Sequence, residues 1–441
     1  MPYTTTTLDQ FAAQVGVLMD DTAEVYWSRQ EKYFAIWDAL YVWGAYTNYW
    51  RARGTFNLIP STAYYDLAVE LPALRTRTWT LDQLTKEIQF MCLEAANGVT
   101  GTGMSGQIGI NSILQAIQRA RNQFVLDARL PYAYNSILAS VPSNGLVSFP
   151  QTSVYVHRAS WQDLSSGVWT NLWREDAWQI DHANPAWPTT PDTPRVYSES
   201  ENAPLVLQVA PPPVNAGTLD AITVDSLVMN LANPAQTFSV PDEWIHAIKF
   251  AALADLLSSE SQCVDPVRSQ YANMRYMQAM ELCKNARSVL RLLYNSIPLP
   301  VDSFAALDAA SPYWRNQPGA PEIAGVLYDF LAFLPGSPDQ TYGIAADVVQ
   351  AAPIPLTGAD YMPIGEEDIP HLLDYIGHML TFKCGGKEFE NTFPQYDAFM
   401  EAVAARGRIN RAKIRNLTAL FATPQKEQGE RPDRMEATQN A

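Results

Sequence analysis

The aromatic-rich segment of residues 28–50 restricts the fold of this chain more than any other feature. Ser28 followed three residues later by Glu31 forms a capping box, in which side chains and backbone satisfy each other's free donors at a helix start. In the helix that follows, apolar residues cover nearly the whole circumference. Such a helix lies either at the centre of a core or against a second subunit. The tryptophans that we expect at a subunit interface are Trp37, Trp43 and Trp244.

Further helices are indicated within an N-terminal helical block of residues 1–145. Thr7 precedes a short amphipathic helix. Thr80 and Gln83 form another capping box ahead of apolar residues at helical spacing, and one more helix follows up to about residue 127.

The character of the sequence changes between residues 146 and 238. Short segments rich in valine, threonine and aromatic residues alternate with turn-forming residues, which is typical of antiparallel strands. These segments are SVYVHRASW, GVWTNLWRE, PLVLQVAPPP and TLDAITVDSL. The proline-rich HANPAWPTTPDTP is expected to be an extended loop. We therefore predict an α+β fold, in which an antiparallel β domain, sandwich- or barrel-like, is inserted into a mainly helical domain.

Residues 239–297 carry the pattern of a long antiparallel helix hairpin that packs with the N-terminal block. Pro241 and the acidic residues after it begin the first helix, which should end near Ser259. Asp265 caps the second helix, which the apolar spacing extends to Asn295.

Residues 298–423 are expected to form a mostly helical C-terminal block, with a strand at QTYGIAADVVQ and a last helix from about Gln395 to Phe421. The tail of residues 424–441 has almost no apolar side chains and is predicted to be disordered. We find no internal repeat in the sequence.

The glycines between Gly101 and Gly106 match the dinucleotide-binding spacing G-x-G-x-x-G. That motif binds a pyrophosphate only where a strand leads into the glycines and a helix follows them. Here a helix precedes them, and Asn97-Gly98 is a helix stop. We therefore interpret the segment as a loop and expect no bound nucleotide or other cofactor.

No catalytic or metal-binding residue is predicted. His371, Asp374 and His378 share one helix face, but the two histidines are two turns apart, whereas zinc-binding helices place their ligands one turn apart. No serine or cysteine nucleophile has a recognisable histidine partner. Glu175 and Asp176 are adjacent, and on a strand they would point to opposite faces.

Five tryptophans in the β domain leave a sugar-binding function open, since aromatic rings stack on sugars. They are Trp161, Trp169, Trp173, Trp178 and Trp187. Tryptophans are more often core and interface residues.

The formal charge of −16 argues against a protein that binds nucleic acid through a basic surface. The cysteines at 92, 263, 283 and 384 are scattered, which favours free thiols in a reducing compartment. We see no secretory signal and no segment able to span a membrane, so we expect a soluble protein made in the cytoplasm.

One basic concentration occurs in ARGRINRAKIRN, residues 405–416. Its residues that share a helix face and could dock on an acidic partner are Arg408, Arg411 and Arg415. The alternative is a solvated helix end, where positive charge complements the helix dipole.

The segment VPDEWIHAIKFAALADLLSSESQCVDPVRSQYANMRYMQAM resembles the helical hairpin of tail-tube adaptor or neck proteins of tailed bacteriophages. The segments VYWSRQEKYFAIWDALYVWGAYTNYWRARGTF and DVVQAAPIPLTGADYMPIGEEDIPHLLDYIGHMLTFKCGGKEFENTFPQYDAF are similar to phage virion proteins. The chain is longer, and its β insertion larger, than in the adaptors of short-tailed phages.

The resemblance implies a non-enzymatic structural protein of the virion, made in the bacterial host and placed at the head-to-tail junction. It implies a ring of about twelve subunits between the portal protein and a tail or nozzle protein. Genomic DNA would pass through the lumen without specific binding, because acidic walls repel phosphates. The alternatives are another portal or neck protein, a carbohydrate-binding tail or baseplate component, and a nucleotide-dependent enzyme.

Overall fold

The computed structural model describes residues 5–92, 108–130, 132–139, 145–149, 153–199, 205–225, 229–258, 264–286 and 288–421. The glycine motif at 101–106, the Asn97-Gly98 stop, Cys263 and the tail at 424–441 lie outside these residues.

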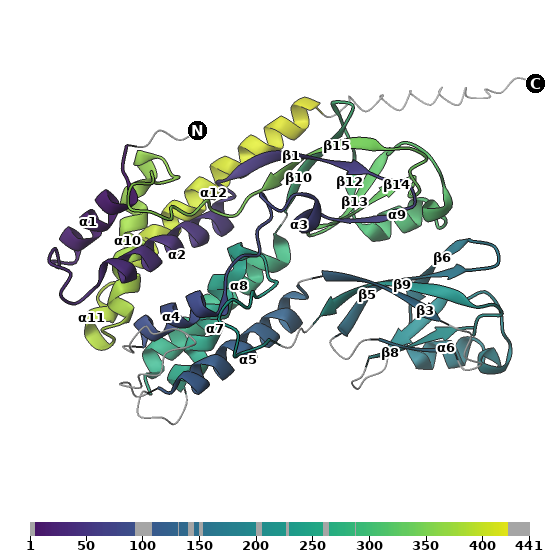
Figure 1. Ribbon diagram of the computed structural model, residues 1–441, viewed down its shortest axis with the longest axis horizontal. Coiled ribbons are helices and arrows are strands. Elements are labelled where there is room, and N and C mark those ends of the chain that lie inside the picture. The colour runs from purple at the N-terminus through teal and green to yellow at the C-terminus, as the bar shows by residue number, and fades with distance from the viewer. Residues whose placement is uncertain are drawn as a thin grey trace, which may run out of the picture.

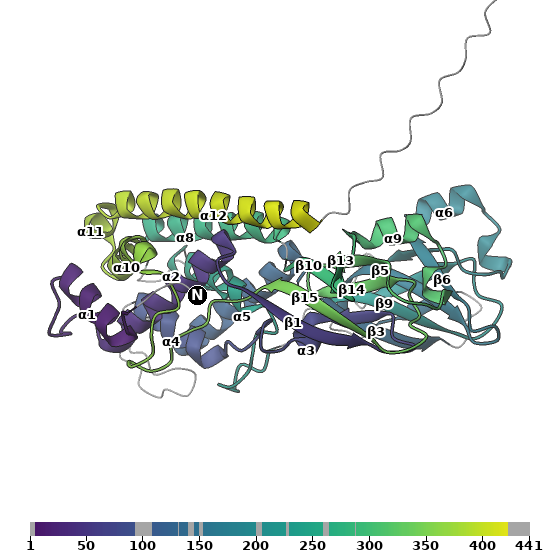
Figure 2. The same ribbon diagram turned by 90° about the horizontal axis from the view of Figure 1, so that it is seen from above.

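The molecule is elongated, with its helices gathered at one end and its sheets at the other (Figure 1). Figure 2 shows the long helix α12, Phe393–Phe421, lying along one side of the helical end. Helices and mostly antiparallel sheets are both extensive, which confirms the predicted α+β class.

Two units of the same design build this architecture. The outer unit contains α1 (Leu8–Leu18), α2 (Arg29–Thr47), β1 (Arg51–Leu58), β15 (Tyr342–Val349), the 3-10 helix η4 (Glu366–Asp368), α10 (Ile369–Phe382), α11 (Gly386–Glu390) and α12. The inner unit contains α4 (Leu81–Met91), α5 (Ile110–Ala128), β3 (Tyr132–Ala139), β9 (Gly217–Asp225), η2 (Asp242–Trp244), α7 (Ile245–Ser258) and α8 (Pro266–Asn285). The inner unit is inserted between the two halves of the outer one.

The equivalent elements have matching lengths. The helices α1 and α4 have 11 residues each, and α2 and α5 have 19 each. The helices α10 and α7, which follow the 3-10 turns, have 14 residues each. The strand after the long helix pairs antiparallel with the strand before the 3-10 turn in both units, as β1 with β15 and as β3 with β9. The expectation of no internal repeat was therefore wrong.

Each unit ties its first helix to the segment before its 3-10 turn in the same way. Thr7 and Thr80 cap α1 and α4 through complete capping boxes. Each threonine also forms an isolated antiparallel bridge, Thr7 with Tyr361 and Thr80 with Thr237. In both units, therefore, the residue that caps the first helix is bonded to the segment that precedes the 3-10 turn.

The first residue of each 3-10 turn holds the chain ahead of the first helix. The Glu366 carboxylate accepts hydrogen bonds from the backbone N–H and the hydroxyl of Thr5, at 2.7 and 2.9 Å. The Asp242 carboxylate accepts the same pair of bonds from Thr78, both at 2.8 Å.

Each unit extends into a β arm. The inner arm is a seven-stranded sheet with the order β3-β9-β5-β6-β7-β8-β4, and it carries the short helix α6, Ala177–Ala183. Its further strands are β4 (Leu146–Ser148), β5 (Ser153–Asp163), β6 (Trp169–Arg174), β7 (Val196–Glu199) and β8 (Val206–Ala210). The four strand segments expected from the sequence are β5, β6, β8 and β9.

The outer arm packs two four-stranded sheets over one apolar core, with the orders β1-β15-β10-β11 and β12-β13-β14-β2. Its further elements are β2 (Tyr64–Asp66), α3 (Leu67–Glu70), β10 (Val289–Tyr294), β11 (Ile297–Pro298), β12 (Val301–Asp302), α9 (Phe304–Ala310), η3 (Trp314–Asn316), β13 (Ile323–Leu327) and β14 (Phe330–Leu334).

Several expected boundaries differ from the structure. The helix predicted up to Asn295 ends at Asn285, because β10 pairs with β15 and its backbone hydrogen bonds are made there. The inserted β domain begins at Tyr132 rather than at 146, after Arg129 ends α5 in the left-handed conformation. The spacing of apolar residues in these two segments is compatible with a helix and with a strand. Both segments are strands because they pair with neighbouring strands. The block of residues 1–145, expected to be helical, also contains the strands β1 and β2, which pair with β15 and β14 far along the chain.

The block of residues 298–423, expected to be mostly helical, contains most of the outer arm. Its apolar run IAGVLYDFLAFLP is the hairpin of β13 and β14, which turns at Tyr328-Asp329. The proline-rich loop expected after α6 also contains a 3-10 turn, η1, at Trp187–Thr189. The hairpin of α7 and α8 and the last helix are confirmed.

Candidate functional site

The two units meet along one face of α2. Asp38 of α2 forms an ion pair with Lys249 of α7, with 2.5 Å between Oδ1 and Nζ, and Lys249 also donates to Glu87 of α4 at 2.8 Å. Phe34 of α2 packs near Phe90 of α4, with ring centroids 5.6 Å apart. The inner unit therefore covers a face of α2 that the outer unit's own helices leave open.

The two carboxyl groups at this contact are buried and have shifted pKa values. Burial raises the pKa of Glu87 to about 7. Burial alone would also raise the pKa of Asp38, but the Lys249 ammonium outweighs it and holds that pKa below its usual range. Asp38 is therefore ionised at neutral pH and forms the ion pair with Lys249 at the α2 face.

A second contact joins α8 of the inner unit to the C-terminal helices of the outer unit. The buried Arg275 guanidinium donates to the Tyr375 hydroxyl at 3.2 Å and lies over the ring of Tyr396, 4.7 Å from its centroid. Tyr396 in turn donates to the side chain of Gln278 at 2.8 Å.

Around α2 the two units use different surfaces: the outer unit contributes α2, whereas the inner unit contributes α4, η2 and α7. The second contact joins α8 to α10 and α12. The contact around α2 is therefore head-to-tail, and the equivalent face of α5 is exposed.

The unused surface of the inner unit is one face of α5, which we call the α5 face. Because α2 and α5 have equal length, their residues correspond one to one, and Arg119 takes the place of Asp38. In α2 the equivalent residues Phe34, Asp38 and Val42 are buried, but in α5 all of these positions are exposed. The residues of the α5 face are Asn111, Gln115, Arg119, Gln123 and Leu126.

The outer unit also has an unused surface, which we call the α1 face. It is formed by Gln14 and Val17 of α1, Glu367 of η4 and Leu373 of α10, which are the equivalents of inner-unit residues at the internal contact. Val17 is 69% exposed and corresponds in position to Phe90.

The predicted interface tryptophans occupy other places. Trp43 and Trp244 are 0% and 1% exposed, so they belong to the core of one chain and not to a surface that a second chain could cover. Trp37 is partly buried and donates its indole N–H to the carbonyl of Pro355 at 3.0 Å. The aromatic helix α2 is central because the second unit is part of the same chain.

Arg408 and Arg411 of the predicted docking face are exposed on α12. Arg415 also lies on α12, and its side chain is outside the described part of the structure. Arg406, two residues earlier, is instead anchored by Glu367 and Asp368. Among the side chains that the structure describes, neither Arg408 nor Arg411 forms an ion pair like those of Arg406.

The histidines considered as metal ligands take packing positions. His371 stacks on Trp43 with ring centroids 6.3 Å apart, and His378 is buried with Nδ1 2.8 Å from the Thr392 hydroxyl. Burial lowers the pKa of His378 to about 3, so it is neutral at physiological pH. Glu175 and Asp176 follow β6 and do not lie on a strand; Asp176 caps α6.

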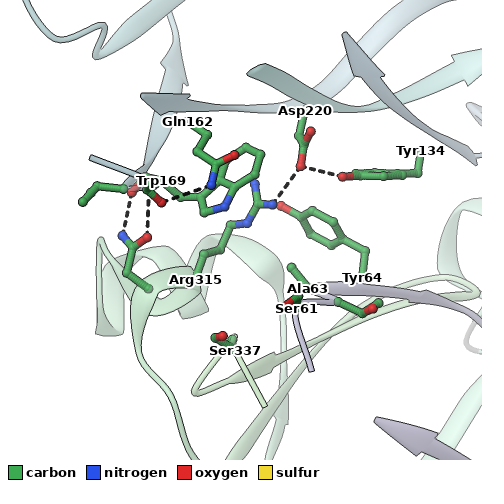
Figure 3. A pocket seen from close by; sticks show the side chains of 14 residues that line it. Ser61, Ala63, Tyr64, Tyr134, Gln162, Trp169, Asp220, Arg315 and Ser337 are labelled. Carbon is green, nitrogen blue, oxygen red and sulfur yellow. Dashed lines mark hydrogen bonds and ion pairs between the residues drawn. The ribbon is translucent and has the colours of Figure 1, made fainter. Parts of the chain in front are cut away.

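Where the two β arms approach each other, they enclose a pocket of about 660 Å³, which we call the inter-arm pocket (Figure 3). The inner arm contributes Tyr134, Gln162, Trp169 and Asp220, and the outer arm contributes the loop before β2, the 3-10 turn η3 and the segment after β14. Sequence reasoning singled out Trp169, but no sequence signal placed it beside Arg315.

The pocket is held by polar contacts between the arms. Asn316 of η3 accepts from the backbone N–H of Trp169 and donates to its carbonyl, both at 2.8 Å. The Arg315 guanidinium lies 3.5 Å from the centroid of the Trp169 ring. Nearby, Arg158 of β5 pairs with Asp308 of α9 at 2.6 Å.

Asp220 and Arg315 form the charged centre of the pocket, and both are buried. Oδ2 of Asp220 accepts from Arg315 Nη2 at 2.8 Å and from the Tyr134 hydroxyl at 2.5 Å. Within the described residues, Oδ1 of Asp220 and Nε and Nη1 of Arg315 have no hydrogen-bond partner.

Among the described residues, no three His, Cys, Asp or Glu side chains gather as a metal-ligand group. Cys92, Cys283 and Cys384 form no disulfide bond there. None of the helices in those ranges is long and apolar enough to cross a membrane. No family model matches this chain, and no curated protein matches it.

Proposed function

We infer that this protein is a structural assembly protein whose chains join side by side into a ring. The observation that carries this inference is the head-to-tail contact between its two equivalent units. A contact that joins two different surfaces of equivalent units can be repeated from chain to chain, and it closes into a ring when the rotation between units allows closure.

In this proposal the contact between two chains has the same geometry as the contact between the two units within one chain. The α5 face of one chain docks on the α1 face of the next, as the α2 face docks on the inner unit within the chain. The α5 face is mostly polar, so we expect chains that stay soluble alone and assemble on a template.

The position that we propose for the ring in the virion is based on the resemblance to phage neck and adaptor proteins. In this proposal the ring lies in the virion between the portal protein and a tail or nozzle protein, and the chain is made in the cytoplasm of the bacterial host. The protein acts by assembly and not as an enzyme. The net charge of −16 supports a lumen through which DNA passes without adhering.

The number of chains in the ring depends on whether one ring position is occupied by a whole chain or by one of its two units. The resemblance implies a ring of about twelve subunits. Because this chain contains two hairpin units, six chains would also supply twelve places.

Mass photometry of the purified chain, alone and mixed with the portal of the same virus, tests the proposal. We expect a ring, or a cap formed only on the portal, whose mass is a multiple of the 49.1 kDa chain. That multiple separates six chains from twelve. A chain that stays monomeric in the presence of the portal would count against the connector function.

A further inference from the structure

We propose that the inner arm of one chain docks on the outer arm of the next chain in the ring. The docking surface, which we call the α6 face, consists of exposed residues of α6 and η1: Ala177, Asp181, Pro188 and Thr189. This contact rests on the proposed function, because it needs a second chain beside the first. It adds a contact between arms to the contact between the α5 face and the α1 face.

The two arms are built alike, as the two helical bundles are. In the inner arm β6 pairs parallel with β7, β7 pairs antiparallel with β8, and β8 pairs antiparallel with β4. In the outer arm β12, β13, β14 and β2 pair in the same way and in the same order. Between the two parallel strands each arm has a helix of seven residues, α6 or α9, and then a 3-10 turn of three residues, η1 or η3. The arms can therefore be matched residue by residue.

The equivalence extends to the side chains of the helix and the 3-10 turn. Trp187, at the start of η1, donates its indole N–H to Oδ1 of Asp181 in α6 at 2.8 Å. Trp314, at the start of η3, donates in the same way to Oδ1 of Asp308 in α9, also at 2.8 Å. Both tryptophans are buried, and each follows its aspartate by six positions. Asp181 is therefore the equivalent of Asp308.

Within one chain, the outer arm contacts the inner arm through α9 and η3. Asp308 forms an ion pair with Arg158 of β5, with 2.6 Å between Oδ1 and Nη2. The Arg315 guanidinium of η3 lies 3.5 Å from the centroid of the Trp169 ring of β6 (Figure 3). The α6 face is the same surface on the inner arm, and its residues are exposed. It is therefore in position to make the equivalent contact with a neighbouring chain.

The surface that should receive the α6 face is part of the sheet of β1, β15 and β10 in the outer arm. The pairing of β10 with β15 shifts in register just before Arg291, and the pairing of β5 with β9 shifts just before Arg158, so these two arginines are equivalent. Arg291 and Arg53 both pair with Asp347, which leaves one net positive charge on what we call the outer sheet face. The Asp181 carboxylate complements that charge.

The two contacts between chains have the same direction. The α5 face and the α6 face both belong to the inner unit of one chain, whereas the α1 face and the outer sheet face belong to the outer unit of the next. Within the chain, the outer unit likewise contributes α2 and α9 to its contacts with the inner unit. One repeated head-to-tail step therefore brings both pairs of faces together.

Disulfide crosslinking between chains tests the contact. Thr189 is the equivalent of Asn316, and Ser296, at the turn between β10 and β11, is the equivalent of Trp169. Within the chain Asn316 is bonded to the backbone of Trp169 at 2.8 Å. Thr189 and Ser296 are both exposed, so Thr189→Cys and Ser296→Cys should fold. After assembly on the portal and mild oxidation, a mixture of the two variants should give a crosslinked dimer on a denaturing gel.

Each cysteine variant alone is the matched control, and neither should give the dimer, because a head-to-tail contact joins two different surfaces. A dimer formed by one variant alone would overturn the proposed contact. Mass photometry of the reduced samples measures ring formation separately. Rings without the crosslinked dimer would overturn the arm contact and leave the proposed function standing, whereas the absence of both would overturn both. The dimer without closed rings would support the arm contact and count against the ring.

A charge variant tests the pairing of Asp181 with Arg291 of the next chain. Asp181→Asn removes the charge and keeps an oxygen that accepts from Trp187, so the circular dichroism should be unchanged. We expect at least tenfold weaker ring formation on the portal. The control is Asp397→Asn, which makes the same change of charge at an exposed position of α12, outside both arms. Equal assembly of the two variants would overturn the pairing.

Discussion

Asp38 and Lys249 form a buried ion pair that joins the outer unit to the inner unit, with 2.5 Å between Oδ1 and Nζ. Both side chains are at most 5% exposed. Removing one partner of such a pair leaves the other charge buried without compensation, which destabilises a protein by about 3–5 kcal/mol.

Lys249→Met is therefore expected to lower the free energy of unfolding by about 3–5 kcal/mol, measured by urea denaturation. The matched control is Lys86→Met, because Lys86 forms an i,i+4 pair with Asp82 that is partly exposed. That substitution should change the free energy by less than about 1 kcal/mol. Equal effects of the two substitutions would show that the buried pair does not hold the units together.

Glu87 should make stability depend on pH. Its pKa is about 7 in the folded chain, above its ordinary value of 4.5, so between these values the folded state keeps a proton that the unfolded state has lost. The stabilisation is complete below about pH 4.5 and is lost as pH rises through 7, by up to about 1.4 kcal/mol per pH unit.

Urea denaturation at several pH values between 5 and 8 measures this effect, with Glu87→Gln as the reference. The difference in unfolding free energy between wild type and Glu87→Gln should fall as pH rises towards 7 and then level off. Two parallel curves would contradict the assignment of the pKa to Glu87.

The contact between chains can be tested from both sides. Leu126→Arg changes the α5 face, where Leu126 is 56% exposed, and Val17→Arg changes the α1 face. Each variant should fold, because the side chains are exposed, and should fail to form rings on the portal. Val69→Arg is the control, since Val69 is 72% exposed on α3, outside both faces.

A mixture of the two variants gives a sharper result. Each variant keeps one intact face, so an equimolar mixture should form complexes of two chains and nothing larger, as read by mass photometry. Rings in the mixture, or in either variant alone, would exclude the α5 and α1 faces as the contact.

The exposed arginines of α12 should matter for a partner and not for the ring. We expect the double variant Arg408→Glu and Arg411→Glu to assemble normally and to bind an acidic partner, the portal or the tail protein, at least tenfold more weakly at low salt. Lys387→Glu on α11 is the control for charge alone, because Lys387 is also exposed. Unchanged binding in pull-down assays would show that these arginines are simply solvated.

Local signals in the sequence predicted the elements well. The capping boxes at Thr7, Ser28 and Thr80 all form, and Asp265 caps α8, because these bonds need only residues close in the chain. The apolar circumference of α2 correctly indicated a helix covered on all sides. What covers it is a second unit of the same chain, and so Trp43 of α2 and Trp244 of η2, both expected at an interface between chains, are core residues.

The duplication was missed because equivalent residues have different surroundings. Asp38 is buried against Lys249, whereas its equivalent Arg119 is exposed and pairs with Asp255, so the two positions share no chemistry. The shared signal that remains is Thr-Leu-Asp-Gln, at residues 7–10 and again at 80–83. The inter-arm pocket was beyond sequence reasoning, because Arg315 and Asp220 meet only through the approach of the two arms.

Because the inner unit is inserted into the outer one, the two units should fold in a fixed order during synthesis on the ribosome. The first strand of the outer unit, β1, emerges long before its partner β15, whereas β3 and β9 are much closer in sequence. Contacts between nearby segments form sooner, so the inner unit should fold first during synthesis. Its surface is then ready to cover α2 while the C-terminal helices are still being translated, and the nascent apolar helix is shielded by its own chain.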